Sequence, residues 1–229
     1  MRVRPRSLNA GIAWLFMIGS SCFAVGATPG YASAVGTVAD LVTFFVGSLF
    51  FTSASYCQLL QAQSPAMAPG AADVDSQGMR APIRFWAWLP HERGWLAAAT
   101  QFPGTLAFNV TTSAALVTGL TVAEQDRQVW RPDFVGSVLF LVASTFAILA
   151  LSAGRRLWDV REWEWWIAWL NMIGSIAFMA SAIASFVLPS SGDYISVAVS
   201  DAGTFVGAVC FFLGAALMLP AWRAAVRAP

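Results

Sequence analysis

Ile-Ala-Trp-Leu-Asn-Met-Ile-Gly-Ser, residues 167–175, is the stretch that decides the fold of this chain. The same residues, apart from one position, stand near the amino terminus at 12–20. A second echo follows each of them, because Asp-Leu-Val-Thr-Phe at 40–44 corresponds to Asp-Ala-Gly-Thr-Phe at 201–205. Such self-similarity indicates a fold built from repeated units. Here the repeated unit is a pair of helices.

A shorter unit also recurs: a glycine, a small residue, two apolar residues and a phenylalanine. Its copies begin at Gly19, Gly47, Gly104, Gly136, Gly174 and Gly207, and they end at Phe23, Phe51, Phe108, Phe140, Phe178 and Phe211. On a helix that turns about 100° per residue, these positions share one face. Small residues let membrane helices approach closely, so we expect each phenylalanine to fill the space left by a neighbour's glycine. The same face could form an oligomer interface, but we favour packing within the chain.

The composition indicates that the solvent of this chain is lipid. Hydrophobic residues make up 58% of its 229 residues and charged residues only 11%, whereas about a quarter of a soluble domain is charged. An apolar helix of about 20 residues crosses a hydrocarbon core of roughly 30 Å. The predicted spans are 10–28, 37–60, 94–120, 133–153, 164–188 and 198–220.

We therefore predict an all-α fold, a polytopic membrane protein whose six-transmembrane-helix bundle consists of three related helical hairpins. The first hairpin covers 1–62, the second 94–153 and the third 154–229, with a cytoplasmic polar loop at 63–93. Together the hairpins form one membrane domain.

The arginines predict the orientation of the chain. Eleven of the thirteen arginines lie in the terminal segments and in the loops 61–93 and 154–163, and only Arg127 and Arg131 lie on the other side. Because cytoplasmic loops carry an excess of positive charge, both termini should face the cytoplasm. Seven of the eleven tryptophans lie at the same ends of the helices, as interfacial anchors do; they are Trp86, Trp88, Trp95, Trp158, Trp163, Trp165 and Trp166. We expect a multi-pass protein of a cell membrane.

A doubled apolar helix that carries Gly-Ser-x-x-Phe in each arm resembles the YrhK-like family of small bacterial membrane domains. The residues that carry the resemblance lie at 18–23 with 46–51, and at 173–178 with 206–211. It covers the first and third hairpins well and the second one loosely, since Thr105 follows Gly104 there and Pro103 precedes it. The resemblance implies a fold and a bacterial inner-membrane location. It implies no activity and no catalytic residue.

Three carboxylates stand at the expected outer starts of helices: Asp40, Asp133 and Asp201. We expect them to cap these helices, because a carboxylate there accepts bonds from free backbone N–H groups. The alternative is a ring of carboxylates that gathers a cation at an outer vestibule.

Polar residues within the spans are candidates for a solute pathway. We select Asn109, Thr112 and Asn171, because Asn109 and the hydroxyls at 111–113 form the densest polar patch. Buried amides and hydroxyls also bond helices together in a membrane, at about 0.6 kcal/mol each. We favour that structural role here.

No residue pattern predicts a catalytic or metal site. His91 is the only histidine, and the three cysteines stand singly inside apolar runs. We expect no enzyme activity, no cofactor, no metal and no nucleic-acid partner; the expected partners are the lipid bilayer and either a second copy or another membrane protein. The leading hypothesis is a non-enzymatic structural or accessory bundle, and the alternative is a small-solute transporter or channel.

Overall fold

The computed structural model describes residues 1–67, 80–152 and 159–227, and within them the chain is almost entirely helical. The helices are α1 (Pro5–Gly26), α2 (Tyr31–Val35), α3 (Thr37–Ala62), η1 (Pro65–Met67), α5 (Arg93–Ala114), α6 (Val122–Gln125), η2 (Asp126–Trp130), α7 (Arg131–Ser152), α8 (Trp163–Ala184) and α9 (Val197–Arg227). Two short strands, β1 (Arg2–Val3) and β2 (Ala81–Pro82), pair antiparallel.

Five helices in the described part of the chain are long and apolar enough to cross a membrane. They are α1, α3, the continuous helix Val122–Ser152, α8 and α9. The prediction of an all-helical membrane protein is confirmed in this respect. The long helix α5 is not among the five; it carries Gln101, Asn109 and the hydroxyls at 111–113.

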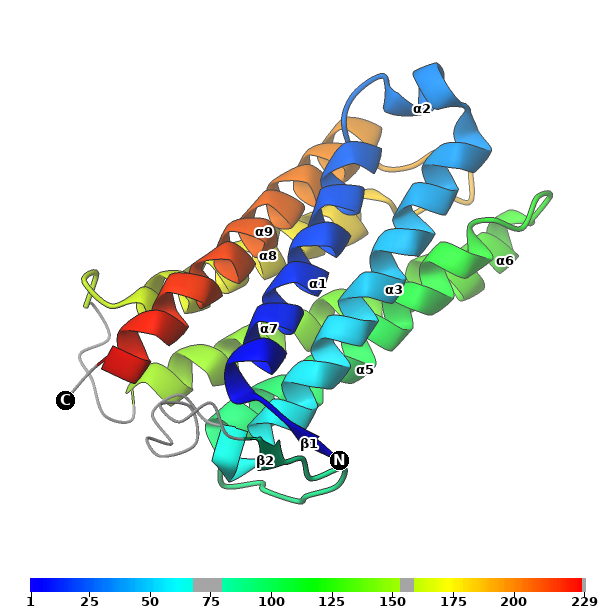
Figure 1. Cartoon of the computed structure of the whole chain (residues 1–229). Helices are drawn as coiled ribbons and strands as arrows, with labels where there is room; N and C mark the ends of the chain where they lie inside the picture. The colour runs from blue at the N-terminus through cyan, green and yellow to red at the C-terminus, as the bar shows by residue number, and fades with distance from the viewer. Residues whose placement is uncertain (68–79, 153–158, 228–229) are drawn as a thin grey trace.

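The six long helices form a closed ring in the order α1, α3, α5, α7, α8 and α9, and α9 packs back against α1 (Figure 1). Neighbours in the ring run antiparallel. At one end, called here the near end, lie β1, β2 and the end of α9; at the other, the far end, lie α2 and α6 (Figure 1). Helices consecutive in sequence form three pairs: α1 with α3, α5 with α7, and α8 with α9.

The outer surface of the ring is apolar. Its exposed side chains include Ile18 on α1, Val46 on α3, Val110 on α5, Val142 on α7 and Ile176 on α8. Exposed apolar surface on this scale is unfavourable in water and suits contact with lipid.

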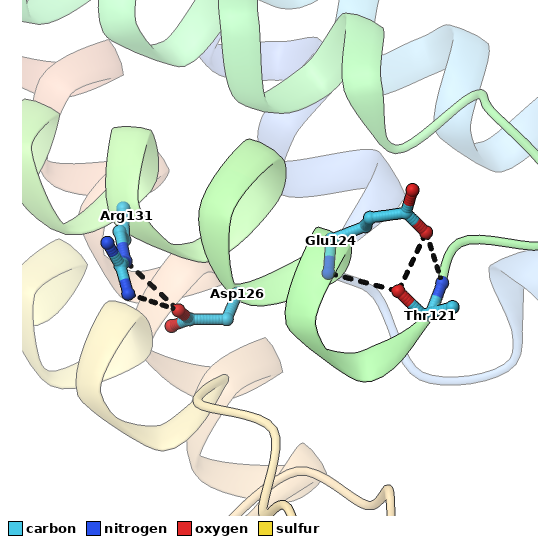
Figure 2. Close-up of polar contacts among 4 residues, drawn as sticks. All are labelled: Thr121, Glu124, Asp126 and Arg131. Carbon is cyan, nitrogen blue, oxygen red and sulfur yellow. Dashed lines mark hydrogen bonds and ion pairs between the residues drawn. The ribbon is translucent and has the colours of Figure 1, made fainter.

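The connection predicted at 121–132 is wrong, because this segment is helical. Thr121 caps α6 reciprocally with Glu124: the Thr121 N–H donates to the carboxylate and the Glu124 N–H donates to the Thr121 hydroxyl (Figure 2). A π-helical turn, η2, then joins α6 to α7, and the Asp126 carboxylate pairs with Arg131 at 2.8 Å across it (Figure 2). The capping box starts the helix early, so α7 has no free amino end.

Other predicted ends shift by several residues. Helix α5 ends at Ala114 and not at 120, and α8 ends at Ala184 and not at 188. After α8 the chain turns back on itself, because the Leu188 N–H donates to the Asp193 carbonyl and Val187 bridges to Tyr194.

The near end is covered by the described parts of the loop predicted at 63–93. Pairing of β2 with β1 buries Ala81 and Ile83 against Leu60 and Met67. The Gln63 side-chain amide donates to the Arg84 carbonyl at 2.8 Å and holds the returning chain in place. Residues 68–79 of this loop lie outside the described residues, as do Arg155, Arg156 and Trp158 near the predicted cytoplasmic ends.

Candidate functional site: a ring with two polar chambers

A layer of phenylalanine rings closes the centre of the bundle. Each long helix contributes the phenylalanine of its Gly-x-x-x-Phe unit: Phe23, Phe51, Phe108, Phe140, Phe178 and Phe211, together called the phenylalanine layer. The ring of Phe140 lies 5.1 Å from that of Phe108 and 5.5 Å from that of Phe211, measured between centroids. Phe140 is only 1% exposed. The Phe140–Phe211 contact is edge-to-face, a geometry that is favourable beyond the area it buries.

Within each pair of helices, the glycine of one helix faces the phenylalanine of the other. A Cβ built on Gly19 would lie 2.7 Å from Cδ2 of Phe51, and one built on Gly47 would lie 3.0 Å from Cδ2 of Phe23. The exchange recurs in the second pair, where a Cβ on Gly104 would meet Phe140 at 2.9 Å.

The third pair shows the same exchange. A Cβ on Gly174 would lie 3.0 Å from Phe211, and one on Gly207 would collide with Phe178. The backbones also approach closely, since a Cβ built on Gly174 would lie 3.1 Å from the carbonyl oxygen of Gly207. Only glycine leaves room for both helices and both rings.

Helices of different pairs contact each other through hydroxyl groups and not through glycines. The Ser48 and Thr112 hydroxyls lie 2.9 Å apart between α3 and α5. The Ser144 and Ser175 hydroxyls lie 2.8 Å apart between α7 and α8. The pairs therefore meet through these hydroxyl contacts and through the rings of the phenylalanine layer, and α9 also packs closely against α1.

On the far side of the phenylalanine layer lies a cavity of about 270 Å³, the far chamber, to which all six long helices contribute. Asp40, Asp133 and Asp201 line it together with Tyr194 and Gln125. A smaller pocket of about 40 Å³ shares Thr112, Asp133 and Ser181 with the far chamber and is also lined by rings of the layer. The far chamber thus reaches down to the phenylalanine layer.

The expectation that the three aspartates cap helices is wrong. Helix α3 begins after Gly36, whose φ of 90° starts the turn, so Asp40 lies inside the helix and its Oδ1 is buried without a partner. The N–H of Val199 donates to the Ser196 hydroxyl, so Ser196 and not Asp201 caps α9. Asp133 follows helical residues and has no free backbone N–H groups to accept from.

On the near side of the layer lies a second cavity of about 600 Å³, the near chamber, lined by α3, α5, α7, α8 and the loop before α5. An axial pocket of about 80 Å³ lies between the near chamber and the layer and touches Phe211. The two cavities share three carboxamide residues: Gln58, Gln101 and Asn171.

The structure separates the three predicted pathway residues. Thr112 lines the far chamber, and its hydroxyl also donates to the Phe108 carbonyl at 2.8 Å. Asn171 lines the near chamber and the axial pocket. Asn109 lines neither chamber; its Oδ1 is buried without a partner. Sequence reasoning missed Tyr194 and Gln125, because they come from a loop and from the unpredicted α6.

Charges around the two chambers are of one sign. Asp40, Asp133, Asp201 and Glu92 line them, and no described residue that lines either chamber is basic. His91 is exposed on its loop. Among the described residues no group of three histidine, cysteine or acidic side chains is close enough to hold a metal ion.

No family model, curated protein or solved structure matches this chain. The resemblance to the YrhK-like domains therefore rests on the Gly-x-x-x-Phe residues alone. What the chain does must be argued from its ring of helices, its two polar chambers and the layer between them.

Proposed function

We propose that this protein conducts a small polar solute across a cell membrane, along the axis of a ring of six membrane-spanning helices built from three related hairpins. Both termini face the cytoplasm, so the near chamber opens inward and the far chamber outward. Helix α5 spans as well: its length equals that of α1, it packs between α3 and α7, and its outer residues Leu106 and Val110 are exposed.

The observation that carries this proposal is the succession of cavities along one axis. From the near end these are the near chamber, the axial pocket, the phenylalanine layer, the small pocket and the far chamber. Successive cavities on each side share lining residues, and only the layer interrupts them. Polar cavities in a membrane protein are costly unless water or a ligand occupies them, which favours a pathway over a packing defect.

The layer gives the pathway a closed state. A constriction lined by apolar rings excludes water and blocks polar solutes without a charged gate. The close glycine contacts behind the rings leave them no room to retreat within a pair. Opening therefore requires the pairs to move apart, at contacts such as Ser48–Thr112 and Ser144–Ser175.

Access of water to each chamber can be tested with single cysteines. In full-length protein whose native cysteines are replaced by serine, Thr112→Cys should react with a membrane-impermeant thiol reagent added outside, and Asn171→Cys with the reagent added inside. The matched control is Leu106→Cys, on the exposed outer face of α5, which should react from neither side. Protection of both chamber cysteines in folded, inserted protein would overturn the proposal.

A second candidate is a non-enzymatic accessory bundle that acts on a membrane partner, a second copy or the bilayer alone. The exchange of glycine and phenylalanine within each pair supports it, because that exchange serves close packing and does not depend on a solute. This candidate predicts dry chambers. The same cysteine experiment therefore distinguishes the two functions.

A further inference from the structure

Three carboxamides converge at the inner side of the phenylalanine layer. Gln58 comes from α3, Gln101 from α5 and Asn171 from α8, so each pair of helices contributes one of them. They line the axial pocket together with Phe16 and Phe211. Among the described residues no charged side chain lines this pocket, and its volume of about 80 Å³ holds more than one water-sized particle.

The hydrogen-bonding capacity of these carboxamides is unused. Gln58 Oε1 is buried and has no partner among the described residues. Within the described part of the chain, neither the Gln101 nor the Asn171 side chain is bonded to another protein group. A buried acceptor without a partner is destabilising, so a ligand that donates to or coordinates it in this pocket recovers free energy.

The charged side chains that line the two chambers indicate the sign of the charge that a ligand should carry. A solute that enters from the far end passes Asp40, Asp133 and Asp201, and one that leaves by the near chamber passes Glu92. No described basic residue lines any of these cavities. Carboxylates in a cleft with low-dielectric walls concentrate cations and repel anions.

The geometry points to a binding site for a small monovalent cation, formed by the side-chain oxygens of Gln58, Gln101 and Asn171 beneath the phenylalanine layer. This inference rests on the proposed pathway and names its substrate class. Neutral carbonyl dipoles replace part of the hydration shell of such an ion, as they do in selective channels. The rings of Phe16 and Phe211 add attraction for a cation of the ammonium type.

A monovalent ion suits this site better than a divalent one. Divalent cations require several carboxylate or water ligands in close array. The axial pocket offers three neutral amides, and the described residues contain no close group of three acidic, histidine or cysteine side chains.

The test uses full-length protein in liposomes, with methylammonium, urea and chloride as the probes. Methylammonium should pass, and Gln101→Leu or Asn171→Leu should lower its flux about tenfold, the effect of losing roughly one charge-assisted hydrogen bond. The matched control is Asn109→Leu, because Asn109 is a carboxamide on the same helix as Gln101 but lines none of these cavities, and its flux should stay at the wild-type level.

Flux of urea or chloride without methylammonium would overturn the cation site and leave the pathway standing. A binding measurement tests for the opposite case, a cation site in a protein that conducts no solute. In detergent, methylammonium chloride should raise the unfolding temperature of the wild type and of Asn109→Leu, but not that of Asn171→Leu. If the unfolding temperature shifts in this way but no flux is measured, the cation site is supported and the proposed pathway is contradicted. If Asn171→Leu and the wild type shift equally, the cation site is contradicted.

Discussion

The hydroxyls of Ser48 and Thr112 lie 2.9 Å apart at the interface of α3 and α5, where the first pair of helices meets the second. Each hydroxyl has one proton, so one of them donates across this contact while the other donates within its own helix. The acceptors there are the Phe45 carbonyl for Ser48 and the Phe108 carbonyl for Thr112. The link between the two pairs is thus a contact that each partner can lose without leaving a buried group unbonded. This is the property required of an interface that opens.

Thr112→Val should therefore reduce stability only slightly. Valine keeps the shape of threonine and removes the hydroxyl contact, and interhelical bonds of this kind contribute about 0.6 kcal/mol in membrane proteins. Reversible unfolding in mixed micelles measures the change. A loss of several kcal/mol would show that the interface is rigid and would contradict opening at this place.

Glycine-to-alanine substitutions on α1 should separate tight positions from open ones. Gly19→Ala places a methyl group 2.7 Å from Phe51 and 2.9 Å from the Gly47 carbonyl oxygen, and such overpacking costs about 1–3 kcal/mol. Gly11, on the same helix, has open space at its Cβ position, so Gly11→Ala should be neutral or stabilising by up to about 1 kcal/mol. Thermal unfolding in detergent compares the two. Equal effects would mean that the backbones of α1 and α3 are not in close contact.

Phe140→Ala should open the phenylalanine layer. Its ring contacts those of Phe51, Phe108, Phe178 and Phe211, so its loss leaves a gap on the axis between the two chambers. We expect flux of methylammonium that no longer saturates, together with lower stability. The control is Phe205→Ala, on the exposed face of α9, which should leave flux unchanged. A folded Phe140→Ala protein that stays closed would place the gate elsewhere.

Asn109→Leu should leave the flux of solute near the wild-type value. Asn109 is buried in α5 but lines neither chamber, whereas Asn171 lines the axial pocket. Because Asn109 Oδ1 has no partner, the leucine variant should be at least as stable as the wild type. Parallel flux and unfolding measurements on Asn109→Leu and Asn171→Leu check this. Loss of flux in the first variant alone would return the pathway to Asn109.

The sequence predicts the long helices well because their apolar runs and the Gly-x-x-x-Phe spacing both carry helical information. Its errors fall where a local signal decides the boundary. Thr121 and Glu124 form a capping box that starts a helix inside the predicted connection. The starts of α3 and α9 agree with the predicted spans to within one residue, so the error there concerns the role of the carboxylates: Asp40 and Asp201 lie a few residues past these starts and line the far chamber.

The chambers themselves were beyond prediction from the sequence, and the reason is geometric. Periodicity gives the face on which a residue lies, but not the neighbour that this face meets. Asn109 in α5 and Asn171 in α8 are both polar residues within long helices that run from the near end to the far end, so the sequence does not distinguish them. Only the closed order of the ring shows that Asn171 meets Gln58 and Gln101 around a pocket, while Asn109 does not.

The exchange of glycine and phenylalanine within pairs has a consequence for biogenesis. Gly19 and Gly47 receive each other's phenylalanine, as do Gly174 and Gly207, so the tightest contacts of a helix are with the next long helix in the chain. A pair is complete as soon as its second helix leaves the ribosome. On the six-span topology proposed above, insertion can then proceed two helices at a time, so that α5 enters the bilayer with α7 as its partner and with α3 already in place beside it.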